Sequence, residues 1–386
     1  MAGYPPVIGW TGASLHHPLG GARGIVRPMH SAEASPQAVA AVTHSGSAIP
    51  HALATERAWC REALLRVSRT FALNIRCLRG RMLETVRLAY LLCRAADTLE
   101  DSWPGPPAEV AARFDALLAA LDGDAGAARS LSAAATVQHA RADMDLLVRL
   151  PALLHVLGSL RPDDAADVRR CVRTMALGMK RYATREATRG TRVPYLDDDA
   201  ELHDYCYVVA GCVGEMLTRL VARDIRDDGA ETAARRLALA PVVGEALQLT
   251  NILLDWPVDV RRGRCHIPAS WLARHGLAPR ELVRGSDAAR ELSLRLASLA
   301  HGAIDRVPDY LDTIPTSEHR YRLFCLLPVL WARASLRVAF ARRDFHCAPH
   351  RPRLSRASVL GEGLRGLLVH ANHGATRQAL GPSRAD

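Results

Sequence analysis

Apolar residues recur at spacings of three and four along most of the chain, from about residue 53 to residue 345. On an α-helix this spacing gathers the apolar side chains on one face, which can pack against a core. No alternating pattern of the kind that forms strands and hairpins stands out. The pattern therefore predicts an all-α protein in which residues 51–345 form a single helical domain. Clusters of Pro, Gly and Asp mark the expected breaks between helices at residues 102–107, 122–126, 161–164, 190–199, 226–229, 263–268 and 307–308.

Both ends of the chain depart from this pattern. Residues 1–50 hold seven Gly and six Pro but only three charged residues, so we expect a flexible, low-complexity N-terminal tail there. Met29 lies inside this segment and is an alternative start site. Residues 346–386 are polar and rich in Arg, and we expect a C-terminal tail.

Composition favours a folded protein, because 49% of the 386 residues are hydrophobic and 23% are charged, close to average globular usage. No apolar run reaches the roughly 18 residues that a membrane-spanning helix needs, and a signal-peptide pattern is absent. We therefore expect a cytoplasmic protein. The nine Cys include no C-x-x-C pair, which favours reduced core thiols over a zinc site or disulfides.

The formal net charge is +10, and every basic residue except Lys180 is an Arg. Such a charge suits nucleic acid, an anionic membrane or a phosphorylated substrate, whereas Arg-favouring codon usage explains it without any partner. No RNA-binding motif, Cys/His finger or basic zipper accompanies the charge, so we expect no nucleic-acid partner. Residues 361–366 match G-x-G-x-x-G, but no strand precedes them and no dinucleotide-binding unit can close after them.

A charged stripe runs along one expected helix, over residues 88–101. Tyr90, Arg94, Asp97 and Asp101 are spaced so that they share one face, while Leu and Ala occupy the rest. Two carboxylates one turn apart repel each other unless a cation lies between them. Mg²⁺ that carries a phosphate is a natural occupant.

A second stripe, over residues 244–259, repeats the design with Gln248, Asn251, Asp255 and Asp259. A solvated helix face could explain either stripe alone, because D-x-x-x-D occurs often by chance. Two stripes on two apolar helices favour facing aspartate pairs that hold several Mg²⁺ ions around a diphosphate.

Two further segments contribute. Arg69, in the Ser68 to Phe71 segment, and Arg264, five residues beyond Asp259, carry guanidinium groups that suit phosphate oxygens, although surface Arg is the alternative. Residues 205–214 place Ala210, Gly211 and Gly214 within an apolar helix. Small residues there allow either an isoprenoid tail or another helix to approach the backbone closely.

Together, residues 68–71, 90–101, 205–214 and 248–268 resemble the squalene and phytoene synthase family in order and separation. The resemblance covers about residues 55–345. It implies an isoprenoid-synthase-type single-domain bundle with a central active-site cavity. In such enzymes Mg²⁺ held by two D-x-x-x-D motifs assists the head-to-head joining of two prenyl diphosphates.

The resemblance also implies roles for the residues singled out above. The Mg²⁺ ligands would be Asp97, Asp101, Asp255 and Asp259. The catalytic set adds Tyr90 and Tyr205, and a tyrosine at the position of Tyr205 would assist the proton loss that closes a cyclopropane ring. The substrate-binding set would be Ser68, Arg69, Phe71, Arg94, Val209, Gly211, Gly214, Gln248, Asn251 and Arg264.

The chain departs from the family pattern in three ways. Leu254 stands where the family usually has Arg or Lys, which would remove one contact to the diphosphate. Pro257, inside the second motif, should kink or end the helix close to Asp259. We also expect no C-terminal membrane anchor of the kind that eukaryotic squalene synthases carry.

Residues 324–330 resemble the corresponding squalene synthase segment and favour farnesyl diphosphate as substrate, with squalene as product. The alternatives are a phytoene synthase that uses geranylgeranyl diphosphate and an enzyme that stops at presqualene diphosphate or dehydrosqualene. A non-catalytic assembly factor is a further alternative, but we would expect such a protein to lose the aspartates. A squalene synthase would use NADPH, which Asn251 and Tyr90 could orient in the same cavity. We expect a monomer that contacts a membrane peripherally to release its product.

Overall fold

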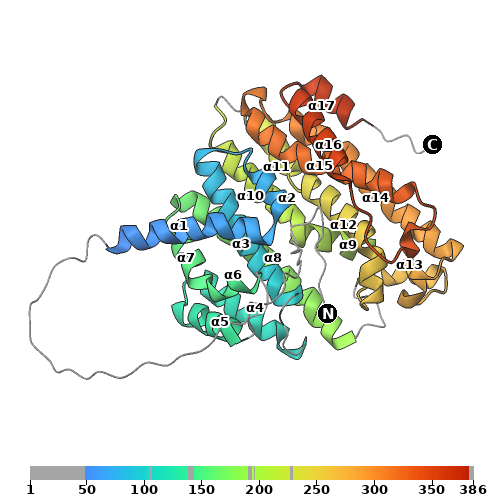
Figure 1. Ribbon diagram of the computed structural model, residues 1–386, viewed down its shortest axis with the longest axis horizontal. Coiled ribbons are helices and arrows are strands. Elements are labelled where there is room, and N and C mark those ends of the chain that lie inside the picture. Colours follow the sequence, from blue (N-terminus) through green and yellow to red (C-terminus); the bar gives the residue numbers. More distant parts are fainter. Residues whose placement is uncertain are drawn as a thin grey trace, which may run out of the picture.

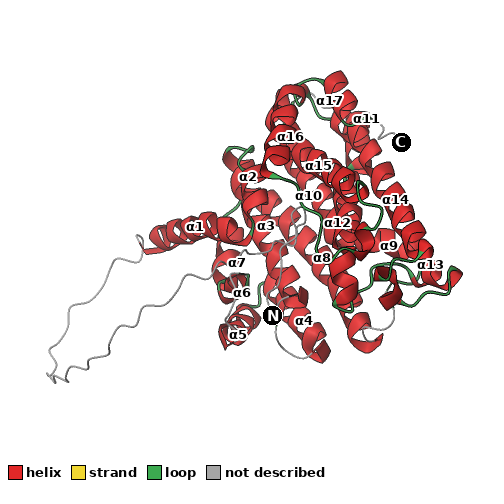
Figure 2. Ribbon diagram, turned by 45° about the vertical axis from the view of Figure 1, so that its right-hand side comes forward, coloured by secondary structure: helices red, strands yellow, loops and turns green. Residues whose placement is uncertain are grey.

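The computed structural model describes residues 48–101, 103, 107–137, 143–189, 194, 196–226 and 229–381. Every regular element among them is a helix, and Figure 2 shows no strand in this part of the chain. The prediction of an all-α protein is therefore confirmed. The helices are α1 (Ala48–Val67), α2 (Arg69–Ile75), α3 (Gly80–Asp101), α4 (Val110–Leu121), α5 (Ala125–Val137), α6 (Met144–Val148), α7 (Leu150–Gly158), α8 (Pro162–Arg189), α9 (Asp199–Cys206), α10 (Cys212–Ala222), α11 (Ala230–Leu239), α12 (Pro241–Arg261), α13 (Ala269–Arg274), α14 (Asp287–Asp312), α15 (His319–Phe340), α16 (Arg356–Val369) and α17 (His373–Ala379). Short 3₁₀ helices cover Pro107–Glu109 (η1), Pro279–Val283 (η3), Thr316–Glu318 (η4) and Phe345–Cys347 (η5), and η2 (Tyr207–Gly211) is a π-helix.

Two helices organise the bundle. In the N-terminal half, α3 packs against α1, α4, α6, α7 and α8. In the C-terminal half, α12 packs against α10, α14, α15 and the π-helix η2. Helix α8 contacts α3 as well as α10, so it joins the two halves (Figure 1). The two charged stripes of the sequence therefore lie on the two helices at the centre of the fold.

The described N-terminal boundary is the first residue of α1, Ala48. The tail expected over residues 1–50 falls almost wholly outside the described residues, so it stays a prediction.

The C-terminal segment differs from the expected tail. Helices α16 and α17 follow residue 346, and they pack against α15 and α14. The buried Arg322 of α15 fixes this arrangement, since its guanidinium donates to the carbonyl oxygens of His370, Leu311 and Ile314. The inner face of α16 carries the small residue Gly366 while its leucines face outward, so the sequence pattern did not reveal this packing. The helical domain therefore continues well past residue 345.

Three helical stretches are long and apolar enough to cross a membrane by length and composition alone. They span Asp199–Ala222, Ala230–Arg261 and Thr316–Phe340, and 72%, 61% and 78% of their apolar windows are buried inside the protein. The expectation that no stretch of the chain reaches this length was therefore wrong. Burial in the bundle accounts for their apolar composition, because a helix at the centre of a large core is apolar on every side.

Candidate active site

The first stripe lies on the most deeply buried part of α3. Tyr90 is completely buried, and Arg94 and Asp97 are only 3% and 2% exposed. Burial raises the pKa of the Tyr90 hydroxyl to about 12, although the charge of Arg94 opposes the shift. The ring of Tyr90 stacks on Phe71 of α2 with the centroids 5.4 Å apart. Ser68 caps α2, because its hydroxyl accepts from the Phe71 amide. The stripe and the Ser68 to Phe71 segment are thus brought together.

Arg94 joins two carboxylates. It donates from Nη2 to Asp143 Oδ2 at 3.1 Å, and its Nη1 lies 3.7 Å from Asp97 Oδ2. A charge this deeply buried needs such partners, since an unpaired ion in the core is costly. Asp143 was missed by the sequence analysis, because it follows α5 in a connection where no helical spacing ties it to α3. Asp101 ends α3 and Arg69 begins α2, and the side chains of both lie outside the described part of the structure.

The second stripe lies on α12, which continues through Pro257 and ends at Arg261. The helix therefore ends two residues beyond Asp259, close to the point that Pro257 predicted. Asn251 is buried, Gln248 is half-buried, and the side chains of Asp255 and Asp259 are each 23% exposed. Leu254 is buried in the core and lies off the polar face.

A guanidinium reaches this stripe from an unexpected place. Arg351, five residues before α16, forms an ion pair with Asp255 and donates to Asn251 Oδ1 at 3.2 Å. Its side chain is nearly buried. Arg351 thus provides the positive charge beside the second motif that residue 254 lacks. It was missed because the segment around it, which also holds Arg353 and Arg356, reads as a polar tail.

A contact links the ends of the two helices that carry the stripes. Arg264 Nη2 lies 4.0 Å from Glu100 Oε1, and the side chain of Glu100 is only 9% exposed. Glu100 stands next to Asp101 at the end of α3, and Arg264 lies in the turn that follows α12. The C-terminal ends of α3 and α12 therefore converge, as the matched stripes predicted.

Tyr205 is connected to the second stripe through a residue that the sequence analysis missed. The Tyr205 hydroxyl lies 3.3 Å from His266 Nε2, and His266 Nδ1 lies 3.7 Å from Asp259 Oδ2. The edge of Tyr182 packs against Tyr205 at 5.3 Å between centroids. These contacts place the phenol of Tyr205 at the same end of α12 as the aspartates. A His seven residues beyond Asp259, beside Arg264, was the available signal in the sequence.

The small residues of 205–214 serve helix packing. A Cβ on Gly214 would lie 2.1 Å from the Ala240 carbonyl oxygen, and one on Gly244 would lie 2.3 Å from that of Ala210. Gly211 packs against Pro241 in the same way. The glycines therefore let η2 and α10 approach the backbone of α12. Of the two alternatives that the sequence allowed, the small residues serve contact with another helix. Val209 is buried in η2, a π-helix of the kind often found at functional sites.

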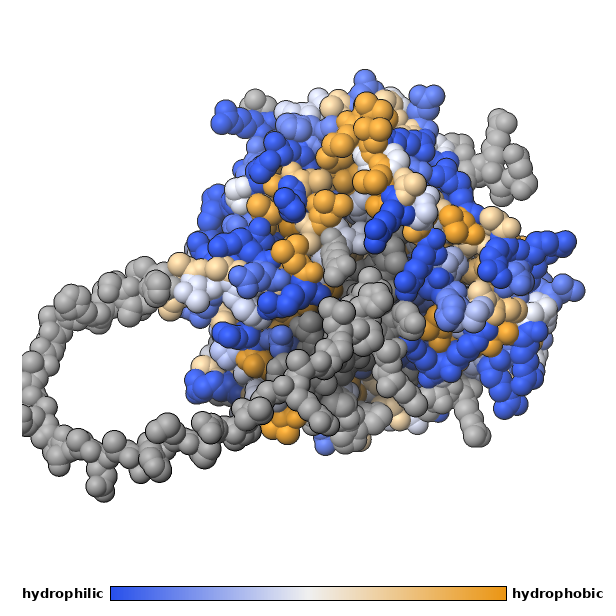
Figure 3. Space-filling view, in the orientation of Figure 1, coloured by the Kyte–Doolittle hydropathy of each residue, from blue (hydrophilic) through white to orange (hydrophobic). Residues whose placement is uncertain are grey.

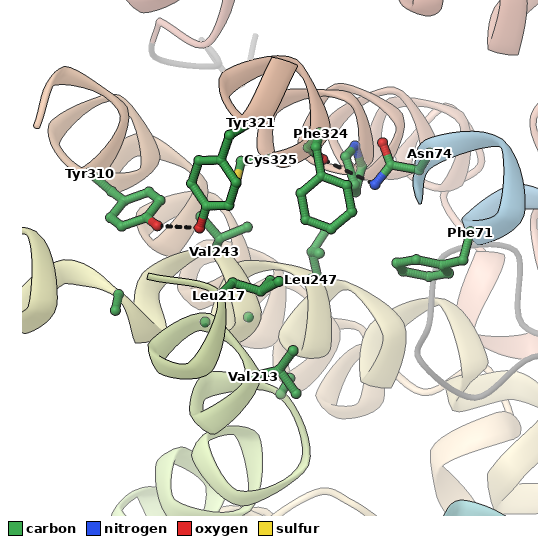
Figure 4. A pocket seen from close by; sticks show the side chains of 15 residues that line it. Phe71, Asn74, Val213, Leu217, Val243, Leu247, Tyr310, Tyr321, Phe324 and Cys325 are labelled. Atoms are coloured by element: carbon green, nitrogen blue, oxygen red, sulfur yellow. Dashed lines mark hydrogen bonds between the residues drawn. The ribbon is translucent and has the colours of Figure 1, made fainter. Parts of the chain in front are cut away.

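A narrow apolar cavity lies beside these helices. Figure 4 shows Phe71 at one end and the hydrogen-bonded hydroxyls of Tyr310 and Tyr321, 2.7 Å apart, at the other. Among the residues predicted to bind substrate, Phe71 and Gly214 line it, whereas the aspartates do not. Along α12 the cavity residues Val243, Gly244 and Leu247 precede Gln248, the first polar residue of the stripe. The apolar cavity thus adjoins the polar stripe of α12.

The donors suit Mg²⁺ in kind, because carboxylate and amide oxygens are its usual protein ligands. The described residues hold no ready-made group of three or more His, Cys, Asp or Glu side chains for an ion. Instead Asp97 lies beside Arg94, and Asp255 is paired with Arg351. Charged partners of this kind are what a buried carboxylate needs when no cation is bound. Asp97, Asp255 and Asp259 are the described residues that fit such an ion.

Residues 64–358 match the family model described as squalene/phytoene synthase. The chain therefore belongs to the squalene/phytoene synthase family, and the family resemblance read from the four segments is confirmed. It is 27% identical over 291 residues to a squalene synthase of Eremothecium gossypii, a match that covers 73% of this chain and 62% of that one. It is 36% identical over 133 residues to a phytoene synthase of Pseudescherichia vulneris, covering 34% of this chain and 39% of that one. The matches thus span less than two thirds of either relative.

Solved structures establish the fold. TcSQS in complex with the ligand BPH1237 superposes with a TM-score of 0.69 at 22% identity, covering 84% of this chain and 89% of that one. A dehydrosqualene synthase in complex with a ligand gives a TM-score of 0.56 at 21% identity, covering 83% and 98%. The bundle is thus of the type found in isoprenoid synthases, as predicted.

Proposed function

We propose that this protein joins two prenyl diphosphates head to head. The observation that carries the proposal is that the ends of the two helices that bear the aspartates meet through the contact between Arg264 and Glu100, beside an apolar cavity. Family membership supports the same activity. The charged region suits a diphosphate, and the apolar lining of the cavity suits the hydrocarbon chain attached to it.

Arg94, Arg264 and Arg351 would bind the diphosphate, since guanidinium groups match phosphate oxygens in geometry and charge. Asp97, Asp255 and Asp259 would hold Mg²⁺, which when bound neutralises the charge of the departing diphosphate. Tyr90 is neutral at physiological pH, as an ordinary tyrosine is, and burial raises its pKa further, to about 12. Its phenol can therefore orient a substrate oxygen without adding negative charge.

Departure of the diphosphate leaves an allylic cation, and the double bond of the second substrate attacks it. Apolar walls exclude the water that would otherwise quench this cation. A proton must then leave for a cyclopropane ring to close. The Tyr205 hydroxyl lies 3.3 Å from His266 Nε2. Tyr205 and His266 together could receive this proton.

We further propose that the substrate is farnesyl diphosphate and that NADPH reduces the final cation to squalene. Residues 324–330 support this choice, since Phe324, Cys325 and Pro328 line the cavity. Squalene synthases of Eremothecium gossypii and Saccharomyces cerevisiae match over 73% and 74% of the chain, whereas the phytoene synthase of Pseudescherichia vulneris matches over 34%. A cytoplasmic, monomeric enzyme stays our prediction.

The test is to incubate the purified full chain with Mg²⁺ and either farnesyl or geranylgeranyl diphosphate, with and without NADPH, and to identify the extracted products by mass spectrometry. We expect presqualene diphosphate or dehydrosqualene from farnesyl diphosphate alone, and squalene when NADPH is added. Products from geranylgeranyl diphosphate only would make the protein a phytoene synthase. No product from either substrate, with the fold intact, would favour a non-catalytic assembly factor.

A further inference from the structure

Four leucines form an exposed row on the outer face of α16. Leu360, Leu364, Leu367 and Leu368 are 73%, 60%, 56% and 76% exposed. Their spacing of four, seven and eight residues places them on one side of the helix. Figure 3 shows hydrophobic side chains gathered in the upper part of the molecule, where Figure 1 places α16. We call this row the leucine face.

Helix α16 is the reverse of an ordinary surface helix, which turns its large apolar residues inward. Its inner face carries Gly366, where an added Cβ would lie 2.7 Å from Leu327 Cδ2 of α15. Val359 and Val369 complete the packing against the core. Large side chains thus face outward while small ones face the protein.

The helix is also held firmly in this orientation. Trp331 Nε1 donates to the Val359 carbonyl oxygen at 3.1 Å, and Arg322 Nε donates to that of His370 at 2.7 Å. These two bonds fix both ends of α16 on α15. The leucine face is therefore exposed because of how the helix is docked, and a small rotation would break the bonds.

Basic residues lie beside the leucine face. Of the five Arg between residues 346 and 381, Arg351 is buried against Asp255 and Arg377 is paired with two aspartates of α14, which leaves Arg353, Arg356 and Arg365 near the face. The single acidic residue of this segment, Glu362, is paired with Arg337 and Arg365. Arg353 and Arg356, both exposed, lie just before and at the start of the helix. The region thus combines an apolar row with a net positive fringe.

We propose that the leucine face of α16 docks on the surface of a lipid bilayer that contains anionic lipids. At 14 residues and about 1.5 Å per residue, the helix is too short to span a bilayer and would lie in its interface. The arginine fringe complements anionic headgroups. In a two-fold dimer the same arginines would face one another, which disfavours a second copy as the occupant. The inference stands apart from the proposed function, because docking requires no turnover.

The test is sedimentation of the purified full chain with vesicles of phosphatidylcholine alone or mixed with phosphatidylglycerol. We expect binding to the anionic vesicles that weakens as salt rises. The double variant Leu364→Asp/Leu368→Asp should bind at least about tenfold less, because the apolar face no longer enters the interface. Arg353→Gln/Arg356→Gln should weaken binding to anionic vesicles by about tenfold and remove most of its salt dependence.

The matched control is Leu177→Asp/Leu294→Asp, which changes two leucines that are 50% and 46% exposed on α8 and α14. It should bind as the unchanged chain does. Circular dichroism and melting curves confirm that each variant is folded. Equal binding by the α16 leucine variant and the unchanged chain would overturn the proposal, and so would absence of binding by the unchanged chain. A dimer in light scattering that Leu364→Asp/Leu368→Asp converts to a monomer would assign the face to a second copy instead.

Discussion

Arg351 contacts two polar side chains of the second stripe at once, so its loss should affect both stability and substrate binding. Arg351→Ala removes the ion pair with Asp255 and the hydrogen bond to Asn251. We expect destabilisation of about 1–3 kcal/mol, because buried polar groups lose their partner. We also expect a raised KM for the prenyl diphosphate.

Denaturant melts and steady-state kinetics measure the two effects. Arg351→Lys is the control, since it keeps the charge but loses the two-pronged geometry. An unchanged KM in both variants would show that Arg351 serves the fold alone.

Asp97 and Asp143 share Arg94, which allows their roles to be separated. Asp97→Asn should reduce turnover by about a hundredfold or more, because the site would lose a ligand of the Mg²⁺ that neutralises the departing diphosphate. Asp143→Asn removes the other carboxylate partner of Arg94. It should lower the free energy of unfolding by about as much as Asp97→Asn does, with a smaller loss of turnover. Product assays and melting temperatures on both variants decide this. Equal turnover by the two variants would contradict the assignment of Asp97.

His266 contacts both Tyr205 and Asp259, so we expect it to act on the reaction through Tyr205. His266→Phe breaks the link between the Tyr205 hydroxyl and Asp259, and we expect kcat to fall by about tenfold or more with KM little changed. His266→Gln, which can still hydrogen-bond to Tyr205, should recover part of the rate. The double variant with Tyr205→Phe should be no slower than Tyr205→Phe alone. A further loss in the double variant would mean that His266 acts independently of Tyr205.

The spacing of side chains on one helix made part of this site predictable. Tyr90, Arg94 and Asp97 were placed correctly on one face, because helical periodicity fixes their relation. Asp143, His266 and Arg351 come from segments outside those two helices, and only the tertiary fold brings them in. Local periodicity carries no information on such long-range contacts.

At the scale of elements, the close approach of η2 and α10 to α12 depends on two glycines. Gly214 of α10 faces the carbonyl oxygen of Ala240, just before α12, and Gly244 of α12 faces that of Ala210 in η2. Gly214→Ala would place a Cβ 2.1 Å from the Ala240 carbonyl oxygen, so the helices must separate. We expect a loss of about 1–3 kcal/mol in the free energy of unfolding, as overpacking a rigid core does. Thermal or denaturant unfolding measures it.

Gly302→Ala on α14 is the matched control with the opposite sign. An added Cβ there meets nothing within 4 Å, so the higher helix propensity of Ala should stabilise the protein by about 0.5–1 kcal/mol. If both variants change stability in the same direction, the packing explanation for Gly214 is wrong. The sequence alone allowed either a substrate or a helix beside these glycines. Only the position of α12 decides between them.

At the scale of the whole molecule, the single helical domain followed from the pattern of apolar residues, but its C-terminal limit did not. The inner face of α16 is lined by Gly and Val while its leucines face outward, so the pattern that usually reveals a docked helix is inverted. The sequence for that reason suggested a tail where the fold continues through α17.

Truncation after residue 345 should therefore be severe. It would remove Arg351 from Asp255, and α16 and α17 from α15 and α14. We expect a chain that is insoluble or inactive, because the apolar surface of α15 becomes exposed. Truncation after residue 381 should leave activity and melting temperature unchanged. Full activity of the chain that ends at residue 345 would show that the residues after 345 are a dispensable tail.

Arg351 also ties the timing of activity to synthesis. The two aspartate stripes leave the ribosome well before the arginine that pairs with Asp255, and the helices that hold its segment in place follow later still. Domains fold as units while they are made, at about 5–20 residues per second. A nascent chain that has folded α1 to α15 therefore still lacks one charged wall of its pocket. We therefore expect fragments of the chain that end before Arg351 to lack the proposed activity on prenyl diphosphates.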